Sequence, residues 1–186
     1  MIETLRHIDS AAFHFINEDI ANPVLDEFCT RIRGYSFLAL SYIMIAYGIL
    51  KRHPKQFIPI AAAGALTYLL TDQISAHVIK GFIHRIRPCN NPEIGARLLL
   101  DHCGSGFSFV SSHATNCFGT VMFLILLTKT LRRRTVILIT WATLVSFSQV
   151  YVGVHFPADV IGGALVGSLI GGATALLAKK YVVKNI

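Results

Sequence analysis

The sequence has few charged residues: Asp, Glu, Lys and Arg make up 15% of its 186 residues, whereas hydrophobic residues make up 53%. This balance excludes an ordinary soluble domain of this size, which needs a larger polar surface. A helix needs about 20 apolar residues to cross about 30 Å of hydrocarbon, and several such runs are present. The composition therefore predicts an all-α integral membrane protein, with residues 1–186 as a single membrane-embedded domain.

Three other absences narrow the function classes. The net charge is +7, but Lys and Arg do not form a stripe interleaved with aromatic residues, which argues against nucleic-acid binding. The four cysteines lack metal-ligand spacing, so we expect no metal site. The first residues lack the basic, apolar and small-residue segments of a signal peptide. Insertion is therefore expected to depend on the first span.

Five apolar segments are long enough to be transmembrane helices. They cover residues 28–50, 57–80, 109–131, 135–151 and 156–178, where residue 35 is an alternative start of the first. The last is rich in Gly and Ala, which allow close helix contact. Residues 1–20 instead place apolar and charged side chains at helical spacing. This pattern favours an amphipathic helix in the membrane interface, with an ordinary helix packed on the bundle as the alternative.

The distribution of basic residues predicts the orientation, because cytoplasmic loops carry the excess of Lys and Arg. The amino terminus is expected outside and the carboxy terminus inside, in a cytoplasmic (inner) membrane. Residues 80–108, 111–113 and 155–159 then fall on the side that faces the periplasm or exterior. The basic clusters are Lys51, Arg52 and Lys55; Lys129, Arg132, Arg133 and Arg134; and Lys179, Lys180 and Lys184.

The segment 148–159 carries the first catalytic pattern. Pro157 suits the first turn of a helix, so His155 lies just before the amino-terminal end of that helix. Asp159, four positions after His155, can then face the imidazole. A carboxylate beside an imidazole fixes the tautomer and stabilises the imidazolium or phosphohistidine that forms if the other nitrogen attacks. Taken alone, the pair is more typical of a solvated or capping pair at the start of a helix.

Two further polar clusters fall on the same predicted side. Lys80 and Arg87 are about two helical turns apart and offer a point charge and a two-pronged donor to a phosphate. Ser111, Ser112 and His113 mark the expected start of a span, where free N–H groups and hydroxyls cradle an anion. Snorkelling or capping would explain each cluster alone. Together they supply the cations, nucleophile and acid that cleave a phosphoester.

In order and spacing, these motifs resemble the signature of the type 2 phosphatidic acid phosphatase superfamily, whose relatives include bacterial acid phosphatases and vanadium haloperoxidases. The motifs are Lys80-x6-Arg87-Pro88, Ser111-Ser112-His113 and Ser148-Gln149-x5-His155-x3-Asp159. The resemblance implies no metal or cofactor, with His155 as nucleophile, Asp159 as its orienting partner and His113 as general acid. The implied phosphate contacts are Lys80, Arg87, Ser111, the amide of Ser112, and Gln149.

Two positions depart from that signature. Residues 110–113 are Val-Ser-Ser-His where the family usually has Pro-Ser-Gly-His, but the amide of Ser112 can still donate. Gln149 stands where the family usually has Arg, and it offers a neutral hydrogen bond in place of a charged one. Either Arg85 or Arg97 replaces that contact, or the phosphate is bound more weakly, or the chain is catalytically silent. Since the nucleophile, acid and orienting residue are all present, we expect an active enzyme.

The resemblance implies a membrane lipid phosphatase that acts on a lipid phosphate or diphosphate through a phosphohistidine. A bacterial envelope lipid, undecaprenyl diphosphate or lipid A, is favoured because the compact chain has no added soluble domain. Phosphatidylglycerophosphate, phosphatidate, phosphoryl transfer to a second lipid and silent lipid binding are the alternatives. The expected partners are the lipid substrate and membrane lipids, and the oligomeric state is not predicted.

Two features have more than one interpretation. Cys89 and Cys103 lie in one outer loop, where an oxidising compartment could join them, but two separate thiols fit the sequence as well. Asp72 lies in the second predicted span, about two turns before Lys80. A carboxylate at that depth is costly, so a polar partner is expected.

Overall fold

The structure is a computed structural model that describes residues 2–128 and 132–182. Every regular element in these ranges is helical, which confirms the all-α prediction. The main helices are α1 (Ile2–His14), α2 (Pro23–Ile32), α3 (Tyr35–Arg52), α4 (Phe57–Gln73), α5 (Lys80–Ile83), α6 (Ser112–Thr128), α7 (Arg132–Tyr151) and α8 (Pro157–Tyr181). Short π-helical or 3₁₀ stretches cover Phe15–Asp19, Pro54–Gln56, Ile74–Ile79 and Pro88–Asn90.

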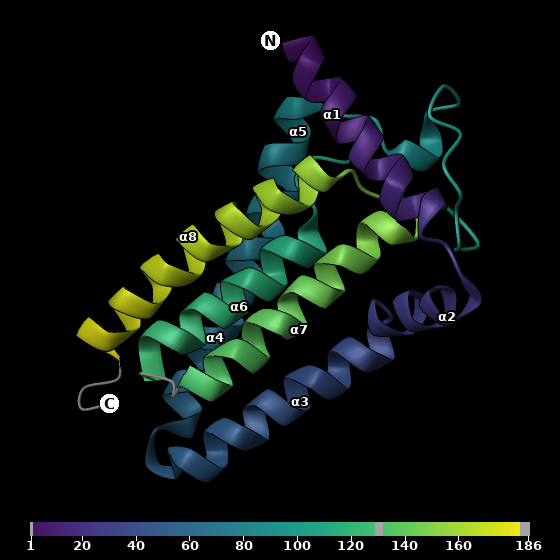
Figure 1. Cartoon of the computed structure of the whole chain (residues 1–186). Coiled ribbons are helices and arrows are strands. Elements are labelled where there is room, and N and C mark those ends of the chain that lie inside the picture. The colour runs from purple at the N-terminus through teal and green to yellow at the C-terminus, as the bar shows by residue number, and fades with distance from the viewer. Residues whose placement is uncertain (1, 129–131, 183–186) are drawn as a thin grey trace.

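Helix α6 is the central helix of the bundle. It packs most extensively on α8, and α7 and α4 also pack against it (Figure 1). Most of its residues from Ala114 to Leu127 are buried, as expected for a helix that is apolar on nearly all sides. Because α6 begins at Ser112, the motif Ser111-Ser112-His113 lies at the amino-terminal end of this central helix.

The contact between α6 and α8 depends on glycines, as the Gly-rich last span predicts. A Cβ on Gly167 would lie 2.2 Å from the carbonyl oxygen of Thr115, and one on Gly171 would lie 2.1 Å from that of Gly119. The two backbones are therefore too close for any side chain at these positions.

Gly171→Ala is expected to lower the melting temperature in detergent by several degrees. The added methyl group meets backbone, which cannot rotate away, and overpacking of this kind costs about 1–3 kcal/mol. The neighbouring change Gly172→Ala is the matched control, since its nearest atom would be 3.6 Å away on the Leu126 side chain. Equal melting temperatures for the two variants, measured by thermal unfolding, would contradict the close contact.

Two helical segments, Pro54–Ile83 and Pro157–Tyr181, are each long and apolar enough to cross a membrane. Helices α2 and α3 would form a third span only as a pair, because they are bent by 58° at Arg33 and Gly34. The predicted span 28–50 is therefore two helices. The span predicted over 109–131 is shorter as well, because α6 starts only at Ser112. Within the described residues the count is two or three, so about five spans stays a prediction.

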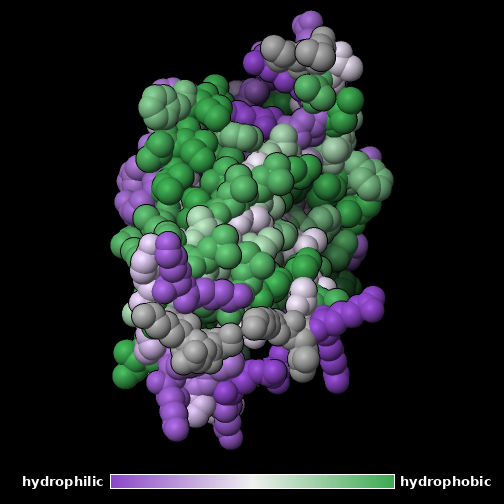
Figure 2. All heavy atoms as spheres, turned by 90° about the vertical axis from the view of Figure 1, so that its left-hand side faces the viewer, coloured by the Kyte–Doolittle hydropathy of each residue, from purple (hydrophilic) through white to green (hydrophobic). Residues whose placement is uncertain are grey.

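The surface is arranged as expected for a membrane protein. Figure 2 shows a broad apolar band between two more polar ends. Helix α1 lies across one end of the bundle, with Leu5 and Ile8 exposed, and its place in the membrane interface stays a prediction. The α3–α4 turn, the start of α7 and the end of α8 lie at the other end (Figure 1). That end carries the predicted basic clusters, except Lys129 and Lys184, which fall outside the described ranges.

Candidate active site

A cavity of about 1270 Å³ lies between α3, α4 and α6 and extends to the turn before α8. Its lining includes Lys80, Arg87, His113 and His155. These residues belong to three motifs that are far apart in the sequence. The structure therefore brings together both predicted histidines and both predicted cations.

A tight reversal of the chain between α7 and α8 positions His155. Gly153 has φ +90°, and the carbonyl of Gln149 accepts hydrogen bonds from the N–H groups of Val154 (3.1 Å) and His155 (3.2 Å). A Cβ on Gly153 would lie 2.6 Å from the carbonyl oxygen of Arg97, so this turn requires glycine for space as well as for conformation. The imidazole is 3% exposed.

Ser108 and Asp159 face Nδ1 of the His155 ring. The Ser108 Oγ lies 3.3 Å from Nδ1 and donates a hydrogen bond to the Asp159 Oδ2, which itself lies 3.6 Å from Nδ1. Because the single proton of Ser108 goes to the carboxylate, its oxygen accepts from the N–H at Nδ1. Nε2 therefore keeps its lone pair. Ser108 was not predicted, since nothing in the sequence distinguishes it from Ser105 in the same loop.

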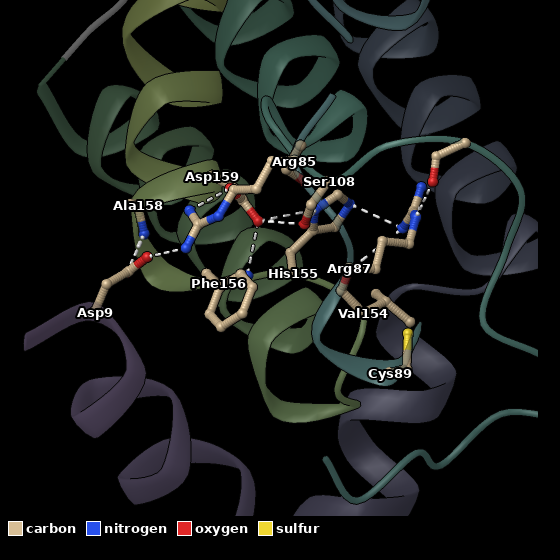
Figure 3. A network of polar contacts seen from close by, with 12 residues as sticks. Asp9, Arg85, Arg87, Cys89, Ser108, Val154, His155, Phe156, Ala158 and Asp159 are labelled. Atoms are coloured by element: carbon tan, nitrogen blue, oxygen red, sulfur yellow. Dashed lines mark hydrogen bonds and ion pairs between the residues drawn. The ribbon is translucent and has the colours of Figure 1, made fainter. Parts of the chain in front are cut away.

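Arg87 faces the free nitrogen of the same ring. Its Nη1 lies 3.3 Å from the His155 Nε2 and 3.3 Å from the Val154 carbonyl oxygen, and its Nε donates to the Gly106 carbonyl at 3.2 Å (Figure 3). Lys80 is 9% exposed and lines the same cavity. A guanidinium therefore lies at the nitrogen that is free to attack, and a second cation lines the same cavity.

A network of ion pairs connects Asp159 to α1. Arg85 contacts the Asp159 Oδ1 at 2.7 Å and the Asp9 Oδ2 at 2.6 Å, and the Asp9 Oδ1 accepts from the N–H of Ala158 at 2.8 Å (Figure 3). The Asp159 Oδ2 also accepts from the N–H of Phe156 at 2.8 Å. Both carboxylate oxygens are therefore held, and the predicted interfacial helix is joined to the site.

The structure supports neither of the arginines considered as a replacement at position 149. Arg85 is held by two carboxylates, and the Arg97 Nη1 contacts both oxygens of Asp26 at 3.0 and 3.1 Å. Neither side chain is part of the cavity lining. Gln149 does line the cavity, but its Nε2 donates to the Val145 carbonyl and the Ser148 Oγ, each at 3.3 Å.

The residues of the second motif have different surroundings. Ser112 lines the cavity at the first turn of α6, and its Oγ accepts from the Ser75 Oγ at 3.0 Å. Ser111, a predicted phosphate contact, is fully buried and is not among the residues that line the cavity, and its N–H donates to the Asp159 carbonyl at 3.0 Å. His113 and Arg33 line the same cavity and interact electrostatically. The position of Arg33 at the cavity was not predicted.

The structure resolves both open interpretations from the sequence. Cys89 and Cys103 form a disulfide, with their Cα atoms 5.8 Å apart. This bond ties the segment that follows Arg87 to the loop whose carbonyl groups hold its guanidinium. Asp72 lines the cavity, and its expected partner is Asn116, whose Nδ2 donates to the Asp72 Oδ1 at 3.1 Å.

Comparisons with known proteins agree with these motifs. A lipid A 4′-phosphatase of Bacteroides thetaiotaomicron is 32% identical over 99% of this chain and 83% of its own length. An undecaprenyl-diphosphatase of Sulfolobus acidocaldarius is 30% identical over 83% of this chain and 69% of its own. The crystal structure of a transmembrane phosphatidylglycerolphosphate phosphatase from Bacillus subtilis superposes with a TM-score of 0.71 at 27% identity, over 98% of this chain and 89% of that one.

The profile of one family covers two thirds of the sequence and all three motifs. The PAP2 superfamily matches residues 61–184. Both this match and the structural likeness confirm the resemblance drawn from the motifs and the expectation of a hydrolase. The chain belongs to the PAP2 superfamily.

Proposed function

We propose that this chain is a membrane lipid phosphatase that removes phosphate from a saccharolipid of the lipid A type, at the outer face of a cytoplasmic membrane. The observation that carries the proposal is a single cavity with a cationic, histidine-containing end and an apolar groove. A soluble phosphate ester would need only the first part. A lipid phosphate needs both.

The apolar part of the cavity follows the axis of α4. Residues of α4 line it at every third or fourth position, from Phe57 through Ile60, Gly64 and Tyr68 to Asp72. At 1.5 Å per residue this face is roughly 22 Å long. On the opposite side α3 contributes mainly apolar residues, which include Leu38, Ala39, Tyr42, Ile45, Ala46 and Ile49. A groove of this length and polarity suits hydrocarbon chains.

A polar pair between the two parts of the cavity supports a sugar head group. Asp72 lies on α4 between the apolar positions and Lys80, and with Asn116 it offers an acceptor and a donor. Hydroxyl and amide groups lie between phosphate and chains in lipid A, whereas a prenyl diphosphate has none there. The similarity to a lipid A 4′-phosphatase supports the same substrate class. The similarity to an undecaprenyl-diphosphatase makes undecaprenyl diphosphate the second candidate substrate.

The geometry at His155 fits attack on phosphorus. Nε2 would form a P–N bond while the P–O bond to the lipid breaks, and His113 would protonate the departing oxygen. Lys80, Arg87 and the amide of Ser112 would stabilise the charge on the phosphoryl oxygens. Water, deprotonated by His113, would then hydrolyse the phosphohistidine.

We expect that protonation of His155 does not lower kcat/KM between pH 7 and pH 5. Burial lowers the pKa of His155 to about 4, against the opposing effect of Asp159. The neutral nucleophile therefore persists in acid, whereas an imidazole with an ordinary pKa of about 6.5 would lose about thirtyfold of its neutral form by pH 5. The phosphate of the substrate also ionises in this pH range. Phosphorus NMR of the lipid in the same detergent measures that ionisation, and the rates are corrected for it. A fall of the corrected kcat/KM below about pH 6.5 would contradict the lowered pKa of His155.

The topology is part of the proposal. Five spans, with residues 1–186 as one domain, would place the amino terminus and the active site outside and the basic clusters inside. A reporter fused after Ile186 should then be active only if it works in the cytoplasm. Activity at that position of a reporter that works only in the periplasm would contradict the predicted orientation.

Phosphate release from a panel of lipids tests the function. Purified protein in detergent is expected to release phosphate fastest from lipid A, more slowly from undecaprenyl diphosphate, and slowest from phosphatidylglycerophosphate and phosphatidate. Asp72→Asn should lower the preference for lipid A while leaving phosphatidate hydrolysis nearly unchanged. The absence of release from every lipid would favour the silent lipid-binding alternative.

A further inference from the structure

A third cationic side chain lines the catalytic cavity without an assigned role. Arg33 follows α2 at the bend before α3, and it lines the cavity together with Lys80, Arg87 and His155. Its Nε is buried and has no hydrogen-bond partner among the residues that the structure describes. A buried charged donor without a partner is costly. A ligand with acceptor oxygens would remove that cost.

The charges around the cavity identify the ligand as an anion. Arg33 and Lys80 each interact with Arg87 as like charges. Cations that share one cavity repel each other, and an anion between them replaces this repulsion with attraction. A phosphoryl group offers up to two negative charges and several acceptor oxygens.

Packing of the preceding residue holds Arg33 in place. The preceding residue, Ile32, is 4% exposed and belongs to a buried cluster with Cys117 and Val121 of α6 and Val145 of α7. Arg33 and His113 also line the same cavity and interact electrostatically. The bend that interrupts the apolar segment 28–50 therefore places a guanidinium beside the proposed general acid.

We propose that Arg33 binds the phosphoryl group and supplies, from the amino-terminal half of the chain, the guanidinium that the third motif lacks at position 149. The inference rests on the proposed function, because it concerns the same cavity and the same phosphate. Among the described residues, Arg33 and Arg87 are the arginines that line this cavity. The amide of Gln149 is instead bonded within its own helix.

The test compares Arg33→Gln with Arg31→Gln in purified protein. Arg31 lies two residues earlier, is exposed and pairs with Glu27, so it is the matched control. Arg33→Gln is expected to lower kcat/KM on lipid A by about 10²–10³-fold, as for loss of one transition-state donor. Its affinity for orthovanadate, measured by calorimetry, should fall at least tenfold. Arg31→Gln should match the parent in both measurements, and Arg33→Lys should retain part of each.

Chemical rescue separates phosphate binding from a structural role. Free guanidinium at millimolar concentration should raise the activity of Arg33→Ala several-fold and leave the activity of Arg31→Ala unchanged. If Arg33→Ala does not fold, the vanadate affinity is compared between Arg33→Lys and the parent. Vanadate affinity equal to the parent in a folded Arg33 variant would overturn the inference. This binding test does not depend on lipid turnover. Failure of the parent to hydrolyse any lipid would therefore count against the proposed function alone.

Discussion

His155→Gln is expected to lower phosphate release by a factor on the order of 10⁵ to 10⁶, the usual cost of removing a catalytic nucleophile. Arg87, whose Nη1 lies 3.3 Å from Nε2, is a guanidinium cation and cannot attack phosphorus. The second imidazole of the cavity, His113, is proposed as the acid and not as the nucleophile. Glutamine keeps a polar group of similar size at the buried position. Orthovanadate should therefore still bind, because the cations and the amide of Ser112 remain.

Trapping of the intermediate makes this prediction specific. Parent protein quenched in alkaline denaturant should carry label from phosphorus-labelled substrate in an acid-labile, alkali-stable form, as expected for phosphohistidine, and His155→Gln should carry none. His77 is an exposed histidine on the π-helical stretch before α5, so His77→Gln is the control and should behave as the parent does. Turnover by His155→Gln at the parent rate would show that another group is the nucleophile.

The parts of this site that could be predicted from the sequence depend on local spacing. Asp159 lies four positions after His155, and helix geometry alone places the carboxylate near the ring. The structure adds that Ser108 lies between the two groups and that Arg85 holds the far side of the carboxylate. Both contacts join segments more than 45 residues apart, and no periodic pattern in the sequence encodes them.

The first predicted span shows why the remaining residues were missed. Residues 28–50 are apolar enough to suggest one straight helix, and hydropathy is insensitive to the direction in which a helix points. The bend falls at Arg33 and Gly34, directly after Cys29 and Ile32, which are both buried against other helices, and such tertiary contacts are not visible in hydropathy. Without that bend, Arg33 would be a snorkelling residue at the end of a span. With it, the side chain reaches the cavity.

His113→Ala is expected to lower kcat on lipid A by about 10² to 10⁴, the usual contribution of a general acid. The loss should depend on the leaving group, because an electron-poor phenolate leaves without a proton whereas a sugar oxygen does not. With an aryl phosphate of that kind, formation of the phosphohistidine should therefore be nearly as fast in His113→Ala as in the parent. The measurement is a burst of phenol release followed by slow turnover, since His113 would also activate the water in the second step. An equal loss with both substrates would assign His113 to binding or folding instead of proton transfer.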